Sequence, residues 1–168
     1  MFFLIGSHFG QRPPTLDHAR TLDAIKEKIA CVVINEMIGK EYVVKAGRYV
    51  ETGRVSPANF GFTQINDHLV SAVSDAIKKH DLRRSAVTDR YIGEANMMGA
   101  RAGFPTIERI AMHAPEFNLY DTPETVAKDT LCPTACAMAD IVRAIDAMPA
   151  EEIGKNPFRA QTTYEDEQ

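Results

Sequence analysis

Hydrophobic positions along the chain alternate between strand-like runs and helix-like spacings. Residues 2–9 form an apolar, aromatic run that ends at Gly10, and this run predicts a first strand. Pro14 then suits the first turn of a helix, where a missing N–H group leaves no hydrogen bond unmade. Apolar residues recur after it at steps of three and four, at Leu16, Ala19, Leu22, Ile25 and Ile29. The first thirty residues are therefore expected to form a strand followed by a helix.

The stretch after this helix has two interpretations. One is a hairpin, with a strand over residues 30–36, a turn at residues 38–40 and a returning strand over residues 41–50. The other is a single buried helix up to Ile38, with Gly39 as its C′ residue. Periodicity alone does not separate a short buried strand from a helix segment. The hairpin is favoured, because a helix that is hydrophobic all round would need burial on every side.

Glycine and proline punctuate the next segment and predict that residues 53–62 form a loop. An amphipathic helix is expected from Thr63 onward. Its apolar face carries Ile65, Leu69, Val70, Val73, Ala76 and Ile77. A strand over residues 85–92, a glycine-rich loop over residues 93–103 and a strand over residues 106–113 are expected to follow.

The last third of the chain is expected to be helical. Asp121 and Glu124 have capping-box spacing, and Pro123 between them suits a first helical turn. Pro133 would remove an intrahelical hydrogen bond and clash with the turn before it. We therefore expect two helices or one kinked helix, with the second part over residues 133–148.

The predicted order of elements is β-α-β-β-α-β-β-α, which indicates an α+β protein. Its first six elements match a ferredoxin-like β-α-β-β-α-β core, extended by an added strand and a C-terminal helix. We expect a mostly antiparallel sheet with helices on one face, and the alternative is a two-hairpin sheet with the same covering. Residues 1–149 are expected to form one domain. Residues 150–168 are expected to be an extended C-terminal tail, because the hydrophobic residues in 153–164 follow neither the spacing of a helix nor that of a strand.

Composition and charge narrow the functional classes by exclusion. The chain has 168 residues, 45% hydrophobic and 25% charged, which suits one globular core. Its 19 basic and 23 acidic residues give a net charge of −4, which argues against a nucleic-acid partner. Three cysteines do not make a disulfide framework, and no apolar run is long enough for a membrane helix. We therefore expect a soluble, cytoplasmic protein with no membrane partner.

Standard catalytic motifs are absent, so the candidate chemistry comes from local clusters of residues. The sequence holds no phosphate-binding glycine loop, dinucleotide fingerprint, zinc-protease motif or nucleophile elbow, and it identifies no cofactor and no metal. Cys132 and Cys136 flank a predicted helix start at Pro133. With Cys132 at the N-cap, the helix dipole would favour its thiolate and make it a candidate nucleophile. The alternative is that both cysteines are small apolar residues that pack between helices.

Two histidines lie at predicted strand ends, where functional side chains are common. His8 is near the end of the first strand, and it is a candidate for substrate binding. His113 ends the last predicted strand and is followed closely by Glu116. An imidazole and a carboxylate at one turn fit a general acid or base with its orienting partner. Hydrogen bonding at a strand terminus explains each histidine equally simply.

The glycine-rich segment after residue 89 mixes acidic, basic and amide groups. Glu94 is a candidate catalytic carboxylate there, and Arg90, Asn96 and Arg101 are candidates for substrate binding. The favoured hypothesis is therefore an enzyme that uses histidine and glutamate acid–base chemistry on a small polar metabolite, at a subunit interface of a homo-oligomer. The alternative is a non-catalytic oligomeric ligand-binding or accessory subunit whose C-terminal segment contacts partners.

Overall fold

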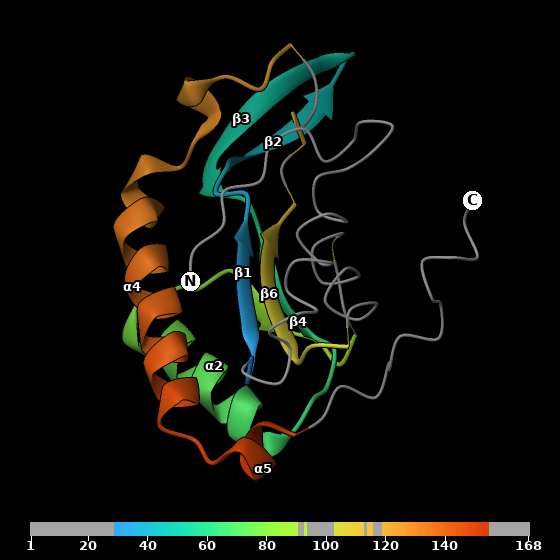
Figure 1. Cartoon of the computed structure of the whole chain (residues 1–168). Coiled ribbons are helices and arrows are strands. Elements are labelled where there is room, and N and C mark those ends of the chain that lie inside the picture. The colour runs from blue at the N-terminus through green and yellow to red at the C-terminus, as the bar shows by residue number, and fades with distance from the viewer. Residues whose placement is uncertain (1–28, 91–92, 94–102, 113, 116–118, 155–168) are drawn as a thin grey trace, which may run out of the picture.

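The computed structural model describes residues 29–90, 93, 103–112, 114–115 and 119–154 (Figure 1). The predicted first strand and most of the first helix lie outside these residues. The elements in chain order are β1 (Val32–Glu36), β2 (Lys40–Lys45), β3 (Arg48–Val55), β4 (Ala58–Phe62), α2 (Asp67–Lys79), β5 (Ser85–Val87), β6 (Thr106–Ala111), a 3-10 turn (Pro123–Thr125), α4 (Lys128–Asp146) and α5 (Ala150–Ile153). The α+β class expected from the sequence is confirmed.

Four strands form a mixed sheet in the order β1-β6-β4-β5. The β1–β6 and β4–β5 pairs are parallel, and only the β4–β6 pair is antiparallel. The expectation of a mostly antiparallel sheet is therefore wrong for this sheet. Its physical origin is connectivity, because α2 links β4 to β5 as a crossover helix and such crossovers join parallel strands. The ferredoxin-like topology is not reproduced in the part of the chain that the structure describes.

The expected hairpin over residues 30–50 is also wrong. Residues 32–36 do form a strand, but β1 pairs with β6, 74 residues away, through contacts such as Val32 with Thr106. The actual hairpin joins β2 to β3 across a tight turn at Ala46 and Gly47, both of which have positive φ. Two consecutive positive φ values match the right-handed twist of the flanking strands. The two strands form a separate two-stranded sheet that extends beyond the main one (Figure 1).

The predicted loop over residues 53–62 is instead the end of β3 and all of β4. Phe60 and Phe62 are buried on the face of β4 that meets the helices. Gly53 lies inside β3 and Gly61 inside β4, and only Pro57 belongs to the two-residue connection between these strands. A strand bordered on both sides by others can be short and rich in punctuating residues because its neighbours supply its hydrogen bonds.

Helices α2 and α4 lie together against one face of the main sheet (Figure 1). The amphipathic helix predicted from residue 63 onward is confirmed as α2, which begins with Asn66 as N-cap. Its Leu69, Val73 and Ala76 pack against residues of α4 spaced by one turn, namely Ala137, Ile141 and Ile145. None of the helices in the described ranges is both long and apolar enough to cross a bilayer.

The C-terminal helix is one continuous element. α4 runs through Pro133, which the helix accommodates in its second turn without ending. Of the two outcomes expected there, two helices or one kinked helix, the structure has a single helix. Residues 150–153, at the start of the expected tail, form α5, and Ile153 packs into the core against α2. Residues 155–168 of that tail lie outside the described residues.

Candidate functional site

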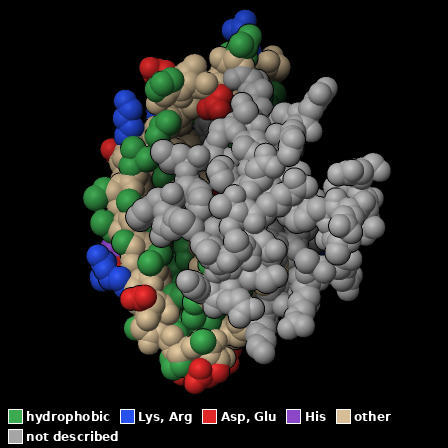
Figure 2. Space-filling model, viewed as in Figure 1, with side chains coloured by type: hydrophobic (Ala, Val, Ile, Leu, Met, Phe, Trp, Pro, Cys, Tyr) green, Lys and Arg blue, Asp and Glu red, His purple; other side chains and the backbone are tan. Residues whose placement is uncertain are grey.

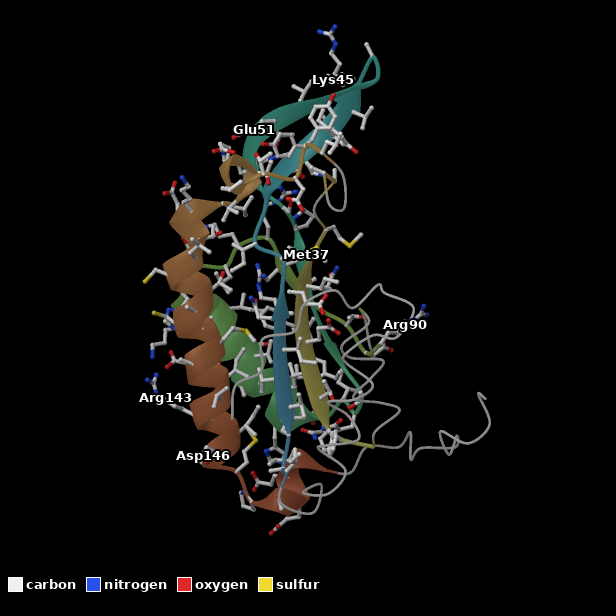
Figure 3. The ribbon with its side chains drawn as sticks, turned by 45° about the horizontal axis from the view of Figure 1, so that its top comes forward. Met37, Lys45, Glu51, Arg90, Arg143 and Asp146 are labelled. Carbon is white, nitrogen blue, oxygen red and sulfur yellow. The ribbon has the colours of Figure 1, made fainter. Side chains whose placement is uncertain are left out.

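A cavity of about 350 Å³ lies between the helix layer and one end of the main sheet. Its walls come from residues 80–85 after α2, from Ile38 and Gly39 after β1, from the ends of β3 and β4, and from two residues of β6. The first two turns of α4 add Asp129, Thr130, Pro133 and Thr134. The cavity reaches the surface, because Asp81, Arg83 and Asp129 in its lining are exposed. Side chains fill the space between the sheet and α4 below Met37, which lies just after β1 (Figure 3).

Arg109 is the buried charged residue in this lining. It is 5% exposed, and its Nη1 donates to the carbonyl oxygen of Met37 at 3.0 Å and to Oδ1 of Asn35 at 3.3 Å. Its buried Nε–H has no acceptor among the described residues, and no carboxylate there forms an ion pair with it. The guanidinium group is therefore held in the protein interior by two neutral oxygen atoms.

The strand itself places Arg109 beneath the helices. Every second residue of a strand points to the same face of the sheet, and in β6 one face carries Ile107, Arg109 and Ala111. Ile107 lies in the core shared with α2 and α4. Arg109 therefore points to the helix side as well. Met37 has a φ of 55°, a conformation uncommon for a residue with a side chain, in the turn that presents its carbonyl to Arg109. Burial lowers the pKa of the Arg109 guanidinium from its usual value.

Thr134 supplies a second unsatisfied polar group to the same cavity. Its side chain is 1% exposed, and the hydroxyl Oγ1 has no hydrogen-bond partner in the described part of the chain. Thr134 follows Pro133, which lacks the N–H group that would otherwise bond to the Asp129 carbonyl one turn earlier. This turn of α4 therefore faces the cavity with a free hydroxyl and with reduced internal hydrogen bonding.

Glu41 and Arg84 join the hairpin to the wall of the cavity. Nη2 of Arg84 lies 2.6 Å from Oε1 of Glu41, and Nη1 donates to the Val55 carbonyl at 2.6 Å. Oε2 of Glu41 accepts from Thr52 at 2.7 Å and from Arg54 at 2.8 Å. These donors, of which Arg84 has the largest effect, lower the pKa of the Glu41 carboxyl to about 2. The charge of Arg84 is thus already matched, unlike that of Arg109.

The pH dependence of stability is expected to report this network. A carboxyl with a pKa of about 2 in the folded chain and about 4.3 when unfolded stabilises the fold above the unfolded value. The free energy of unfolding should therefore fall as the pH drops from about 5 to about 2. In Glu41→Gln this fall should be shallower, as measured by urea denaturation at each pH.

Glu51→Gln is the matched control, since Glu51 lies in the same hairpin but pairs at the surface with a single lysine. It should keep the wild-type slope. If Glu41→Gln left the pH dependence of the unfolding free energy unchanged, the hydrogen bonds to Glu41 would not stabilise the folded state.

The Asp140 carboxylate of α4 contacts Lys79 and His80 at the end of α2 and Arg143 on its own helix. The carboxylate lies 2.8 Å from Nζ of Lys79, 2.7 Å from Nε2 of His80 and 2.9 Å from Nη1 of Arg143. These contacts, of which that with Lys79 has the largest effect, hold the pKa of the Asp140 carboxyl well below its usual range. His80 also lines the cavity. Lys79 and His80 therefore hold the end of α2 against α4, and Lys78 and Lys79 in the last turn of α2 also complement its helix dipole.

Most of the site residues predicted from the sequence lie outside the described residues. These are His8, Glu94, Asn96, Arg101, His113 and Glu116. Arg90 is described and exposed, and it lies on the opposite side of the molecule from Arg143 of α4 (Figure 3). Neither Arg90 nor Cys132 lines the cavity, and the structure does not bring them together.

The predicted position of Cys132 at a helix N-cap is wrong. α4 begins at Lys128 with Ala127 as its N-cap, so Cys132 lies in the second turn, where the dipole acts less on it. Cys132 and Cys136 are both exposed, which also excludes the alternative that they pack between helices. The neighbouring Cys132 thiol raises the pKa of Cys136. A catalytic role for Cys132 stays a prediction without the cap that suggested it.

Comparisons with protein families, with curated proteins and with solved structures found no match to this chain. The candidate site therefore rests on the residues around the cavity alone. Sequence reasoning missed its central residue, Arg109, although a signal was present. In the predicted strand over residues 106–113, Arg109 shares a phase with Ile107 and Ala111, so an inward-facing phase carried a charge.

Proposed function

We propose that the protein binds a small anionic metabolite, with its carboxylate or phosphate group against Arg109. The observation that carries this proposal is a buried guanidinium group that lines a cavity and has no carboxylate partner among the residues that the structure describes. Removing a charged group from water costs several kcal/mol unless a partner compensates it. Two neutral acceptors compensate only part of this cost, and a bound anion would supply the rest.

The rest of the cavity supports the same class of ligand. The hydroxyl of Thr134, which has no partner in the described ranges, is a second donor in the lining. The cavity volume of about 350 Å³ is at the lower end of the range for small-molecule sites, about 300–1,000 Å³. A metabolite with one anionic group and few other heavy atoms fits this volume better than a dinucleotide. Donors that are buried and held by β6 and α4 favour one orientation of the anionic group.

Ligand-induced stabilisation tests the proposal. Small carboxylates and phosphate esters are expected to raise the melting temperature of the wild-type protein, whereas uncharged analogues of the same size should not. In Arg109→Met, affinity for the best anion should fall about 10–150-fold, since a hydrogen bond to a charged group contributes about 1.5–3 kcal/mol. Calorimetric titration measures this change directly.

Arg83→Met is the matched control. Arg83 lines the same cavity, but its side chain is 81% exposed and lies 2.6 Å from Asp81. Its removal should change the affinity less than about threefold, as expected for a screened surface charge. Equal stabilisation by anions and uncharged analogues, or equal losses in the two variants, would overturn the proposal.

The sequence hypothesis adds acid–base chemistry to this binding function. In it, His113 acts as acid or base, Glu116 orients it and Glu94 contacts the substrate at a subunit interface. The expected result is that His113→Ala and Glu94→Gln each abolish turnover of a substrate found for the wild type. Full turnover in both would remove the assignment. The alternative accessory role is tested by deleting residues 155–168, which spares the buried Ile153, and measuring mass by light scattering.

A further inference from the structure

Cys132 and Cys136 lie one turn apart on α4, outside the cavity. Both are exposed, and their Sγ atoms are 4.0 Å apart. The intervening turn buries Thr134 on the opposite side of the helix, so the two thiols face solvent while the helix packs through its other face. Hydrophobic side chains reach the surface along the left edge of the molecule, over α4 (Figure 2).

A disulfide between these two thiols does not suit the helix. Cβ atoms at positions i and i+4 of a helix are about 5–6 Å apart, whereas a disulfide needs about 3.5–4.5 Å. α4 is continuous from Lys128 to Asp146 across both cysteines, so closing the bond would require the helix to unwind. The continuous helix therefore keeps the two sulfur atoms side by side and unbonded.

Two sulfur atoms at this spacing match a bridging soft ion. A metal–thiolate bond is about 2.3 Å long, and two such bonds span at most about 4.6 Å. This slightly exceeds the observed 4.0 Å, so an ion can contact both sulfurs in a bent arrangement without movement of the backbone. The carboxylate one turn further along, Asp140, already holds Lys79, His80 and Arg143. Its oxygen atoms already contact these three side chains, so it is not free to bind an ion.

The number of ligands selects the kind of ion. Structural zinc takes four ligands, and no group of three or more histidine, cysteine, aspartate or glutamate side chains in the described residues is placed to hold a metal. Soft thiolate pairs favour monovalent copper, which accepts low coordination numbers. We propose that Cys132 and Cys136 form a surface site for a soft monovalent ion of the Cu⁺ class. Binding replaces the two thiol protons, which pass to the solvent, and involves no change of oxidation state.

Competition with a chromophoric Cu⁺ chelator under anaerobic, reducing conditions tests this site in the full chain. The wild type is expected to take one Cu⁺ ion per chain. Cys132→Ser and Cys136→Ser should each bind about 100-fold more weakly or worse, because the second donor then no longer binds intramolecularly. Cys31→Ala is the matched control, since Cys31 is the third cysteine, is half-buried against the core and contacts the Val32 carbonyl rather than another thiol. It should keep the wild-type affinity.

Three results would overturn the proposal. The first is a Cys132→Ser or Cys136→Ser variant that binds Cu⁺ as tightly as the wild type does. The second is equally tight binding of Zn²⁺, which would point to a site with more ligands. The third is one ion per two chains with a doubled mass, which would mean that the thiols bridge copies. Both thiols are exposed, so the serine variants should fold, and circular dichroism checks that they do.

Discussion

Arg109→Met is expected to make the unliganded protein more stable. The substitution removes a buried charge that has no ionic partner among the described residues and keeps most of the side-chain volume. Replacement even of a buried ion pair by apolar residues of similar size is often stabilising, by about 1–4 kcal/mol, and a buried charge without an ionic partner is less well compensated than such a pair. The loss of the hydrogen bonds to Met37 and Asn35 offsets about 1 kcal/mol of this gain. The net gain should be about 2 kcal/mol, or about 4–8 °C in melting temperature.

Thermal and urea denaturation in a buffer without added carboxylate or phosphate measure this gain. Arg83→Met, at an exposed ion pair, should change stability by less than about 0.5 kcal/mol. A more stable variant that no longer responds to anions would mean that Arg109 is retained for function at a cost in stability. An Arg109→Met protein less stable than the wild type would instead assign Arg109 a structural role.

Phe60→Ala is expected to cost more than any surface change. Phe60 is 0% exposed on β4, directly opposite Arg109 of β6, and belongs to the core shared with both helices. Truncation of a buried phenylalanine removes its transfer free energy and leaves a cavity, which together cost about 3–5 kcal/mol. This is a large part of the total stability of a domain, about 5–15 kcal/mol. The midpoint of urea denaturation should fall accordingly.

Phe60→Leu, which preserves more of the volume, should lose only a fraction of that stability. The pair of variants also tests the strand assignment of residues 58–62. A loss below about 1 kcal/mol in Phe60→Ala would fit an exposed loop better than a strand at the centre of the sheet.

Local periodicity predicted the elements whose own residues carry a clear apolar pattern, even where the segments that they pack against are distant in the chain. α2 has an apolar face that needs only α4 and the sheet to bury it, so its pattern at Leu69, Val73 and Ala76 is unambiguous. The strand over residues 106–111 was also predicted, and its residues are buried on both faces of the sheet except at Ile110, which is half-buried. β4 was missed because Pro57 and Gly61 are strong turn signals when no partner strand is considered. Pairing between β1 and β6 leaves no local signal, since it joins distant segments.

The candidate site was less predictable than the fold for the same reason. Arg109, Thr134 and the carbonyl of Met37 come from three elements, and none of them belongs to a motif. Their chemistry appears only when burial removes water from a guanidinium group and a hydroxyl. Clusters of polar residues close together in the sequence drew attention to residues 89–103 instead. Patterns of neighbouring residues therefore point to polar loops more readily than to a single charged residue on the buried face of a strand.

The 72-residue separation between Met37 and Arg109 has a consequence for the order of folding. Closing so long a loop has a high entropic cost before any contact rewards it, so β1 is expected to join β6 late. Until then Arg109 lacks the acceptors from the β1 end, and the cavity lacks the wall at Ile38 and Gly39. A partly folded chain would therefore have no complete binding site. A ligand of this cavity would contact the segment just after β1, which is expected to dock last. It should therefore slow unfolding by holding β1 in place rather than by stabilising the whole core.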